Sequence, residues 1–160
     1  MRESIGGGWI MGIVVLFIVL FSGYLAISVN YSKAFKVKNK ILSVIEQREG
    51  YTKQILDNNE WETIGNPNSN VDIKSAQAEI YLYLKQVGYF DNVIKESYCT
   101  DNKLGTYQKG GFCLKRIEAG TGNYYKVTTF LKIEFPVIDF VMKVPISGET
   151  KVIYYDVGSE

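Results

Sequence analysis

The stretch from Ile5 to Val29 constrains this chain more than any other feature, because none of its 25 residues carries a charge. Residues 10–21 within it are almost wholly aliphatic or aromatic. A bilayer core of about 30 Å needs about 20 helical residues, so a helix here is long enough to cross a membrane. Trp9 and Tyr24 lie near its two ends, where amphipathic rings favour the headgroup level. The sequence therefore predicts a single-pass anchor in the cell membrane, with the lipid bilayer as its first partner.

A cleavable signal peptide is the alternative interpretation of the same stretch. Ala26 and Ser28 are small residues at a spacing that suits a signal peptidase. Cleaved signals usually have an apolar region of about 7–15 residues behind a positive segment. Here the apolar run is longer, and only Arg2, beside Glu3, precedes it. A retained anchor is therefore favoured over cleavage after Ser28.

Two glycines in the apolar stretch, Gly8 and Gly12, form a GxxxG step. Small residues at this spacing allow two helices to approach closely in lipid. Glycine is also common in membrane helices without any such role. Gly8 and Gly12 are therefore candidates for helix–helix packing, with a flexible end of the span as the alternative.

The helical pattern continues beyond the apolar stretch, with an apolar stripe at a- and d-like spacing that Lys38 interrupts once. The stripe consists of Tyr31, Ala34, Ile41 and Ile45. No proline or glycine occurs between Tyr24 and Glu49, and Gly50 provides a stop. Residues 1–50 are therefore expected to form one transmembrane helix that continues into an amphipathic stalk.

Residues 51–160 are numerous enough for a small globular core of their own. Residues 57–60 and 65–70 are polar and rich in asparagine, which predicts loop and turn. Trp61 and Ile64 are the apolar residues that would hold this segment down. We therefore expect a globular domain that begins with an irregular segment.

The rest of the globular part predicts an α+β fold. An amphipathic helix is expected from Asp72 to Val87, with Gly88 ending it. Beyond Gly88 the pattern becomes strand-like, with turn clusters between the runs. The expected strands are 93–99, 112–117, 124–135 and 152–157. The fold class is therefore a long helix, a second amphipathic helix and a small antiparallel sheet of about four strands.

Cys99 and Cys113 flank the first turn of the expected β region. A disulfide between them would close a 15-residue loop and contribute about 3 kcal/mol to stability. Two unrelated buried thiols are the alternative. We favour the disulfide, which implies an oxidising compartment and places the C-terminal domain outside the cytoplasm.

The charges beside the apolar stretch favour the opposite orientation. Four lysines follow it with no acid among them, namely Lys33, Lys36, Lys38 and Lys40. By the positive-inside rule, this cluster would place the C-terminal domain in the cytoplasm. Lysines at this position also reach lipid headgroups, whatever the orientation. The orientation stays open, with the extracytoplasmic one favoured.

Composition gives little support for catalysis or nucleic-acid binding. The net charge is +1, so no basic excess offsets phosphate repulsion. There is no histidine, which removes the commonest general base and metal ligand. Two cysteines alone do not complete a tetrahedral zinc site, and no phosphate-binding loop or nucleophile elbow occurs. We expect a non-enzymatic protein with no catalytic, cofactor-binding or metal-ligating residues and no nucleic-acid partner.

A long apolar helix, an amphipathic stalk and a small antiparallel sheet resemble the layout of pilins and pseudopilins. More specifically, YKVTTFLKIEFP at 125–136, VIDF at 137–140 and VPISGETK at 144–151 resemble TadE-like proteins of tight-adherence pilus systems. Chains of that family often end in a strand, a proline-marked apolar turn and a returning strand. The resemblance implies a structural or accessory subunit of a bacterial surface or secretion apparatus. Its partners would be other pilin-like subunits or assembly-platform proteins, in a homo- or hetero-oligomer.

The chain departs from type IV-like precursors at one motif. Those precursors carry a glycine followed five residues later by a glutamate, where a prepilin peptidase cuts. Here Met11, Gly12 and Ile13 stand five residues after the three glycines at 6–8. A relative of that family would therefore remain unprocessed and held in the membrane. The alternative function is a membrane-anchored scaffold or regulator whose cytoplasmic domain binds a protein or ligand.

Overall fold

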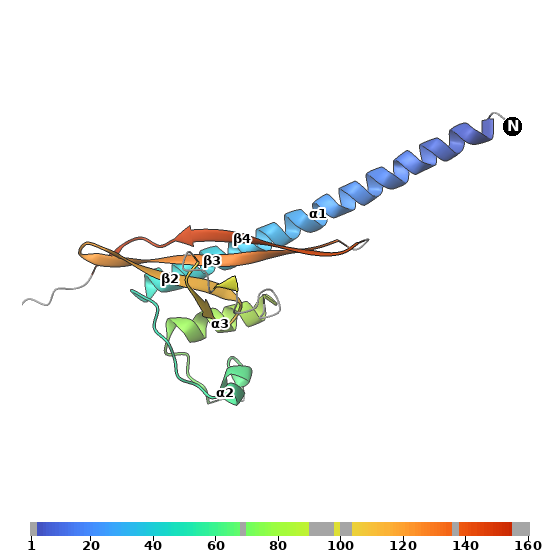
Figure 1. Ribbon diagram of the computed structural model, residues 1–160. Helices are drawn as coiled ribbons and strands as arrows, with labels where there is room; N and C mark the ends of the chain where they lie inside the picture. Colours follow the sequence, from blue (N-terminus) through green and yellow to red (C-terminus); the bar gives the residue numbers. More distant parts are fainter. Residues whose placement is uncertain (1–2, 68–69, 90–97, 100–103, 136–137, 155–160) are drawn as a thin grey trace, which may run out of the picture.

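The computed structural model describes residues 3–67, 70–89, 98–99, 104–135 and 138–154 (Figure 1). Three helices come first: α1 (Glu3–Gln47), α2 (Asn58–Thr63) and α3 (Ala76–Gln86). Five strands follow: β1 (Thr106–Gln108), β2 (Phe112–Ala119), β3 (Gly122–Phe135), β4 (Ile138–Glu149) and β5 (Ile153–Tyr154). This arrangement confirms the α+β class and the long N-terminal helix.

The helix α1 is 45 residues long, and its N-terminal half extends away from the rest of the molecule (Figure 1). It ends where the sequence predicts a stop. Glu49 and Gly50 have φ angles of 53° and 146°, which a helix cannot continue through. The Gly50 N–H donates to the Ile45 carbonyl at 2.9 Å and so satisfies one of the last carbonyls of the helix.

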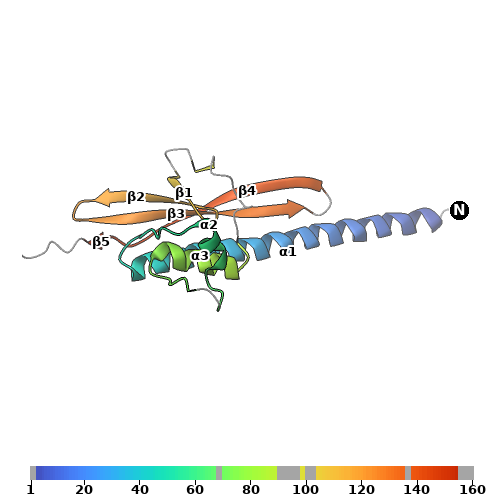
Figure 2. The same cartoon turned by 90° about the horizontal axis from the view of Figure 1, so that it is seen from below.

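The sheet is antiparallel, in the order β1-β2-β3-β4 (Figure 2). The central strand, β3, pairs with β2 along one edge and with both β4 and β5 along the other. Pro145 lies within β4 opposite Phe130. Because β4 is an edge strand, this proline removes no donor that the ladder needs.

The strand positions differ in part from the expected ones. Strands β2 and β3 include the expected ranges 112–117 and 124–135, whereas the strand β4 was not among the four expected. Of the expected strand 93–99, residues 93–97 lie outside the described residues, and Cys99 lies in a turn. Of the expected 152–157, the structure has the short strand β5, and 155–157 lie outside the described residues.

One face of the sheet packs against α1 and α3, and the main core lies between these layers. Its buried residues are Val37, Ile41, Val44, Ile45, Ala76, Ile80, Leu84, Tyr89, Phe112, Leu114 and Val127. Four of them come from α1, so the C-terminal half of this helix is part of the core. The stalk half of α1 and the part of the chain beyond residue 50 therefore share one core.

The N-cap of the helix α3 is Ser75 rather than Asp72, three residues later than expected. The Ser75 hydroxyl accepts a hydrogen bond from the Ala78 N–H at 3.1 Å. The helix ends one residue before Val87, and Gly88 follows with a left-handed φ of 61°. This backbone conformation suits glycine, which has no Cβ.

The segment expected to be only loop and turn contains the short helix α2. At its start the Asp57 N–H donates to the Glu60 carboxylate at 2.9 Å. Trp61 and Ile64 are buried in a second cluster with Ala78 and Tyr81 of α3. The Trp61 and Tyr81 rings meet edge to face, with their centroids 4.9 Å apart. These two apolar residues hold the segment against α3, as the sequence predicts.

Candidate functional site

The N-terminal half of α1 has an exposed apolar surface on every side. All its large apolar residues from Trp9 to Phe21 are at least 47% exposed. Within the described residues, α1 is the one helix long and apolar enough to cross a membrane. Contiguous apolar surface of this size is unfavourable in water and marks contact with lipid or another protein. No part of the described chain covers this half of α1, so its surface is open to lipid or to another protein.

The GxxxG step lies on this open surface. A Cβ placed on Gly8 or Gly12 would meet no atom within 4 Å. Together with Trp9, Ile13 and Leu16, the two glycines line a shallow hollow of about 350 Å³. A second helix therefore has free access to both glycines.

The structure buries only three of the four residues of the apolar stripe on the stalk. Ala34, Ile41 and Ile45 are buried, whereas Tyr31 is 53% exposed. Tyr31 stands about 90° around the helix from the centre of the buried face, given 100° per residue. It stacks instead on Phe35, with ring centroids 6.4 Å apart, and the Lys38 ammonium lies 4.2 Å from the Phe35 centroid. Tyr31, Phe35 and Lys38 form a row on the flank of the stalk, which we call the stalk row.

The strands β3 and β4 lie along the stalk, where β3 runs toward the apolar half of α1 and β4 runs back (Figures 1 and 2). The Thr129 hydroxyl donates to the Ala34 carbonyl at 3.3 Å, and Leu131 is buried against Ala34. Ile27, Val144 and Ile146 pack around this contact. The sheet is thus in contact with α1 up to the end of the uncharged stretch.

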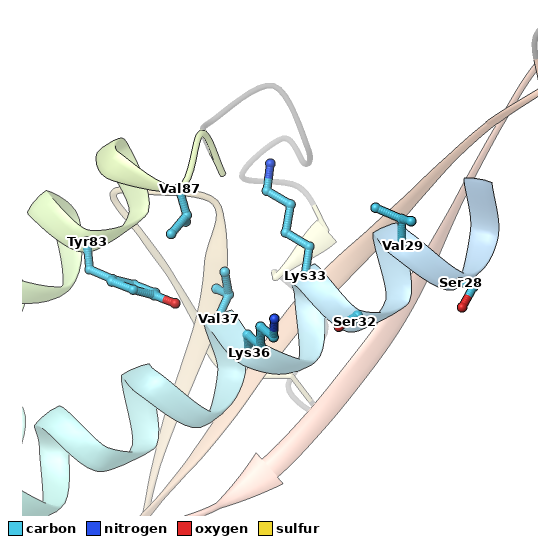
Figure 3. A pocket seen from close by; sticks show the side chains of 8 residues that line it. All are labelled: Ser28, Val29, Ser32, Lys33, Lys36, Val37, Tyr83 and Val87. Carbon is cyan, nitrogen blue, oxygen red and sulfur yellow. The ribbon is translucent and has the colours of Figure 1, made fainter. Parts of the chain in front are cut away.

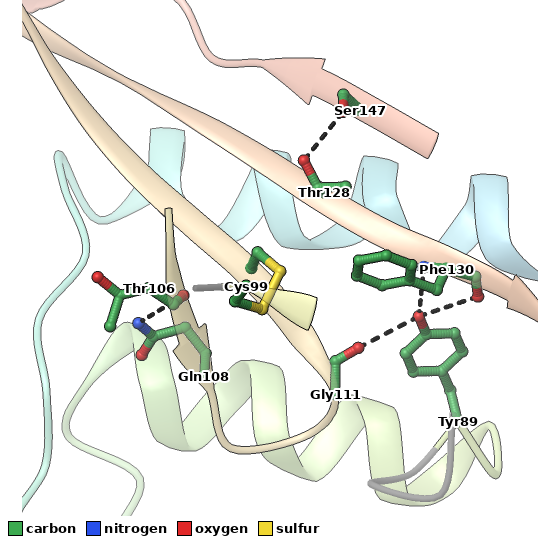
Figure 4. Close-up of a disulfide and its surroundings, with 9 residues drawn as sticks. Tyr89, Cys99, Thr106, Gln108, Gly111, Thr128, Phe130 and Ser147 are labelled. Atoms are coloured by element: carbon green, nitrogen blue, oxygen red, sulfur yellow. Dashed lines mark hydrogen bonds between the residues drawn. A yellow bond between two sulfur atoms is a disulfide. The ribbon is translucent and has the colours of Figure 1, made fainter. Parts of the chain in front are cut away.

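Cys99 and Cys113 are joined by a disulfide, with their Cα atoms 5.6 Å apart (Figure 4). Both residues are buried, in a cluster with Phe130, Leu104 and Tyr107. Cys113 and Phe130 alternate along their strands with core residues such as Leu114 and Leu131, so they face away from α1. The disulfide therefore ties residue 99 to the face of the sheet opposite the helices.

The Tyr89 hydroxyl forms a polar centre beside this cluster (Figure 4). It accepts from the Phe130 N–H at 2.8 Å and lies 3.1 Å from the Phe130 carbonyl and 3.4 Å from the Gly111 carbonyl. Burial raises the pKa of Tyr89 to about 12, partly offset by the Phe130 N–H. Burial also raises the pKa of Tyr51, whose hydroxyl donates to Gln108 at 2.8 Å. Both tyrosines therefore stay neutral and stabilise the fold.

A pocket of about 540 Å³ lies between α1 and α3, just beyond the uncharged stretch (Figure 3). The helix α1 contributes Ser28, Val29, Ser32, Lys33, Lys36 and Val37, α3 contributes Tyr83, and Val87 follows directly after α3. The sequence singles out Lys33 and Lys36 only as part of a charge cluster. Sequence spacing alone gave no sign of Tyr83 and Val87, because the packing of α3 on α1 brings them there.

In comparisons with known proteins, no family model, no curated protein and no solved structure matches the chain.

Proposed function

We propose that this chain is a pilin-like, single-pass membrane protein, a structural or accessory subunit of a bacterial surface or secretion apparatus. One observation carries the proposal: a single helix has an exposed apolar half and a half that is built into the core of a sheet. Such a helix anchors a globular part directly, without a flexible linker. That is the construction a subunit needs when its packing in the membrane must position what lies outside.

The mechanism is assembly rather than chemistry. In the membrane, the open surface at Gly8 and Gly12 lets a neighbouring helix approach closely. Outside the membrane, the stalk row offers two stacked aromatic rings and a cation to a neighbour's stalk. Subunits that pack both inside the membrane and along the stalk row would be held in a fixed position relative to one another.

The second candidate is a membrane-anchored scaffold or regulator with a cytoplasmic C-terminal domain. The observation that favours it is the lysine cluster just after the apolar stretch, which by the positive-inside rule lies in the cytoplasm. The disulfide favours the first candidate, because such bonds persist in oxidising compartments. Topology therefore separates the two functions.

The deciding experiment is labelling of an added cysteine, Ile55→Cys, on intact cells with a membrane-impermeant maleimide, because Ile55 is fully exposed whereas Cys99 and Cys113 are buried. The pilin-like function predicts labelling without lysis, since residue 55 would lie outside the cell. Labelling only after lysis would place the domain in the cytoplasm and reject this function.

Assembly is tested with a photo-crosslinking residue at Leu16, which lines the same hollow as the two glycines. Crosslinked oligomers are expected in membranes from cells that carry the complete apparatus. Gly12→Ile should reduce them severalfold, because a branched side chain keeps two helices apart. Gly23→Ile, a change at another open glycine of α1, is the matched control. Equal crosslinking in the two variants would remove the GxxxG step from the mechanism.

A further inference from the structure

The pocket between α1 and α3 combines two cations with neutral hydrogen-bond donors. Lys33 uses one of its three donors on the Gly88 carbonyl, at 3.0 Å. Lys36 makes no hydrogen bond or ion pair with the described residues around it. Ser28 and Ser32 contribute hydroxyl groups, and Figure 3 shows the Tyr83 hydroxyl pointing toward α1. The lining thus offers donors to an anion from both helices.

No acid among the lining residues neutralises these charges. The nearest carboxylate on the facing helix, Glu79, lies 2.9 Å from Arg48 and 3.8 Å from Lys40. It is therefore engaged by two other cations, further from the apolar half. Among the described residues, the lining of the pocket therefore keeps a net positive charge, which an external anion would balance.

The position of the pocket, just beyond the uncharged stretch, indicates that the anion belongs to a membrane lipid. Val29 closes the uncharged stretch, and Lys33 and Lys36 lie about 6 and 10 Å further along the helix axis. The headgroup layer on each side of a bilayer is about 5–8 Å thick. Lys33 therefore stands at the depth of the lipid phosphates, and the flexible side chain of Lys36 reaches back to the same level.

An apolar surface leads from the pocket into the membrane. Val29 lines the pocket and is 67% exposed. Leu25 and Ile18, which are 47% and 61% exposed, lie four and eleven residues before it on the same face of the helix. An acyl chain on this face would have apolar contacts where a free phosphate would have none.

We propose that this pocket binds the phosphodiester headgroup of an anionic phospholipid, with the acyl chains along Leu25 and Ile18. The inference rests on the membrane span in the proposed function. The two ammonium groups neutralise the phosphate, and the serine and tyrosine hydroxyls hydrogen-bond to the glycerol part. The bound lipid would fill the gap between α1 and α3 and so fix the angle at which the sheet leaves the membrane.

The test is native mass spectrometry of the full chain released from detergent micelles, with phosphatidylglycerol or phosphatidylcholine of identical acyl chains added. The chain should retain phosphatidylglycerol preferentially. Lys36→Gln should lower the retained fraction about fivefold, the equivalent of about 1 kcal/mol for one basic residue at a membrane surface. The double variant Lys33→Gln/Lys36→Gln should retain both lipids equally.

Lys38→Gln is the matched control. It removes the same charge two residues away, but Lys38 stands on the stalk row, over Phe35. A second variant, Ser32→Trp, fills the pocket and leaves both lysines in place, so it should also abolish the preference. This variant keeps the test valid if loss of the contact between Lys33 and Gly88 disturbs the fold.

Three outcomes would overturn the inference: no preference for phosphatidylglycerol, an equal effect of Lys36→Gln and Lys38→Gln, or full displacement of the lipid by inorganic phosphate at the same concentration. The membrane span is tested separately, by extraction of cell membranes with alkaline carbonate. A chain that is extracted contradicts the span and the proposed function, whatever the lipid measurement gives. A chain that stays in the membrane without a lipid preference contradicts the pocket alone.

Discussion

The Tyr89 hydroxyl forms hydrogen bonds with the backbone of β3 beyond the point where β2 stops pairing with this strand. The register between these strands runs as far as Cys113 opposite Thr128, so Gly111 would stand opposite Phe130 two pairs further on. The Tyr89 hydroxyl lies between these two and meets backbone groups of both. It therefore replaces a missing ladder hydrogen bond in a buried place, where unsatisfied backbone groups are costly.

Tyr89→Phe should accordingly lower the free energy of unfolding by about 1–3 kcal/mol, because it leaves the Phe130 N–H unpaired and buried. The measurement is urea unfolding of the detergent-solubilised chain. Tyr154→Phe is the matched control, since Tyr154 is 71% exposed. Equal stability of the two variants would show that the Tyr89 hydroxyl contributes nothing.

The same hydroxyl predicts a loss of stability in alkali. The pKa of Tyr89 is about 12 in the folded chain, against 10.0 for an ordinary tyrosine. The unfolded state therefore loses its proton first, and stability falls as pH rises from about 10 to about 12. The slope from one such group is about 1.4 kcal/mol per pH unit. Unfolding measured at several pH values should show this fall, and Tyr89→Phe should reduce its slope.

At the scale of elements, the disulfide holds residue 99 against the short strand pair β1-β2. Cys99→Ala/Cys113→Ala should lower the free energy of unfolding by about 3 kcal/mol, the value for a loop of 15 residues. Reduction of the unchanged chain should lower stability by the same amount. A loss below about 1 kcal/mol would mean that packing around Phe130 alone holds this segment.

The elements that the sequence predicts well are those with a strong local period. The long helix and its end at Gly50, α3 and the centres of β2 and β3 all follow from patterns of apolar residues. The sequence pattern does not predict the strand β4, because Pro145 and Gly148 suggest that a strand would be interrupted there. An edge strand tolerates both residues. The helix α2 is polar and six residues long, and its stability comes from Trp61 packing on Tyr81.

The candidate sites that the sequence reveals are likewise those formed by residues close together in the chain. The long apolar stretch, the GxxxG step and the cysteine pair are local features, and the sequence alone reveals them. Tyr31 belongs to the apolar stripe by its spacing, but spacing alone does not show how wide the buried face of the helix is. The pocket was missed because Lys36 and Tyr83 are 47 residues apart and meet only through the packing of α3 on α1. Tertiary contacts of this kind have no local signal.

For the whole molecule, the core extends into the stalk, and this predicts which fragments fold. A chain that begins at residue 30 keeps all four α1 residues of the main core, including Val37 and Ile41. It should unfold cooperatively and remain soluble without detergent, because the apolar half is removed. A chain that begins at residue 51 lacks these four residues.

The loss of each buried aliphatic side chain costs about 1–5 kcal/mol, and domains of this size are stable by about 5–15 kcal/mol. The fragment 51–160 should therefore not fold alone. Thermal unfolding of the two fragments, followed by circular dichroism, gives the comparison. A cooperative transition in 51–160 would contradict this prediction and support a domain boundary at residue 50.

The lengthwise contact between the sheet and the stalk also has a mechanical consequence. Thr129 and Leu131 meet Ala34, and the Lys151 N–H donates to Glu46 at the other end of the stalk. A force along the axis of α1 loads these contacts together in shear, instead of peeling them apart one after another. The helix and the sheet would then respond to a pull as one stiff rod. A small tilt of the apolar end of α1 would therefore move the far tip of the sheet through a wide arc, as a lever does.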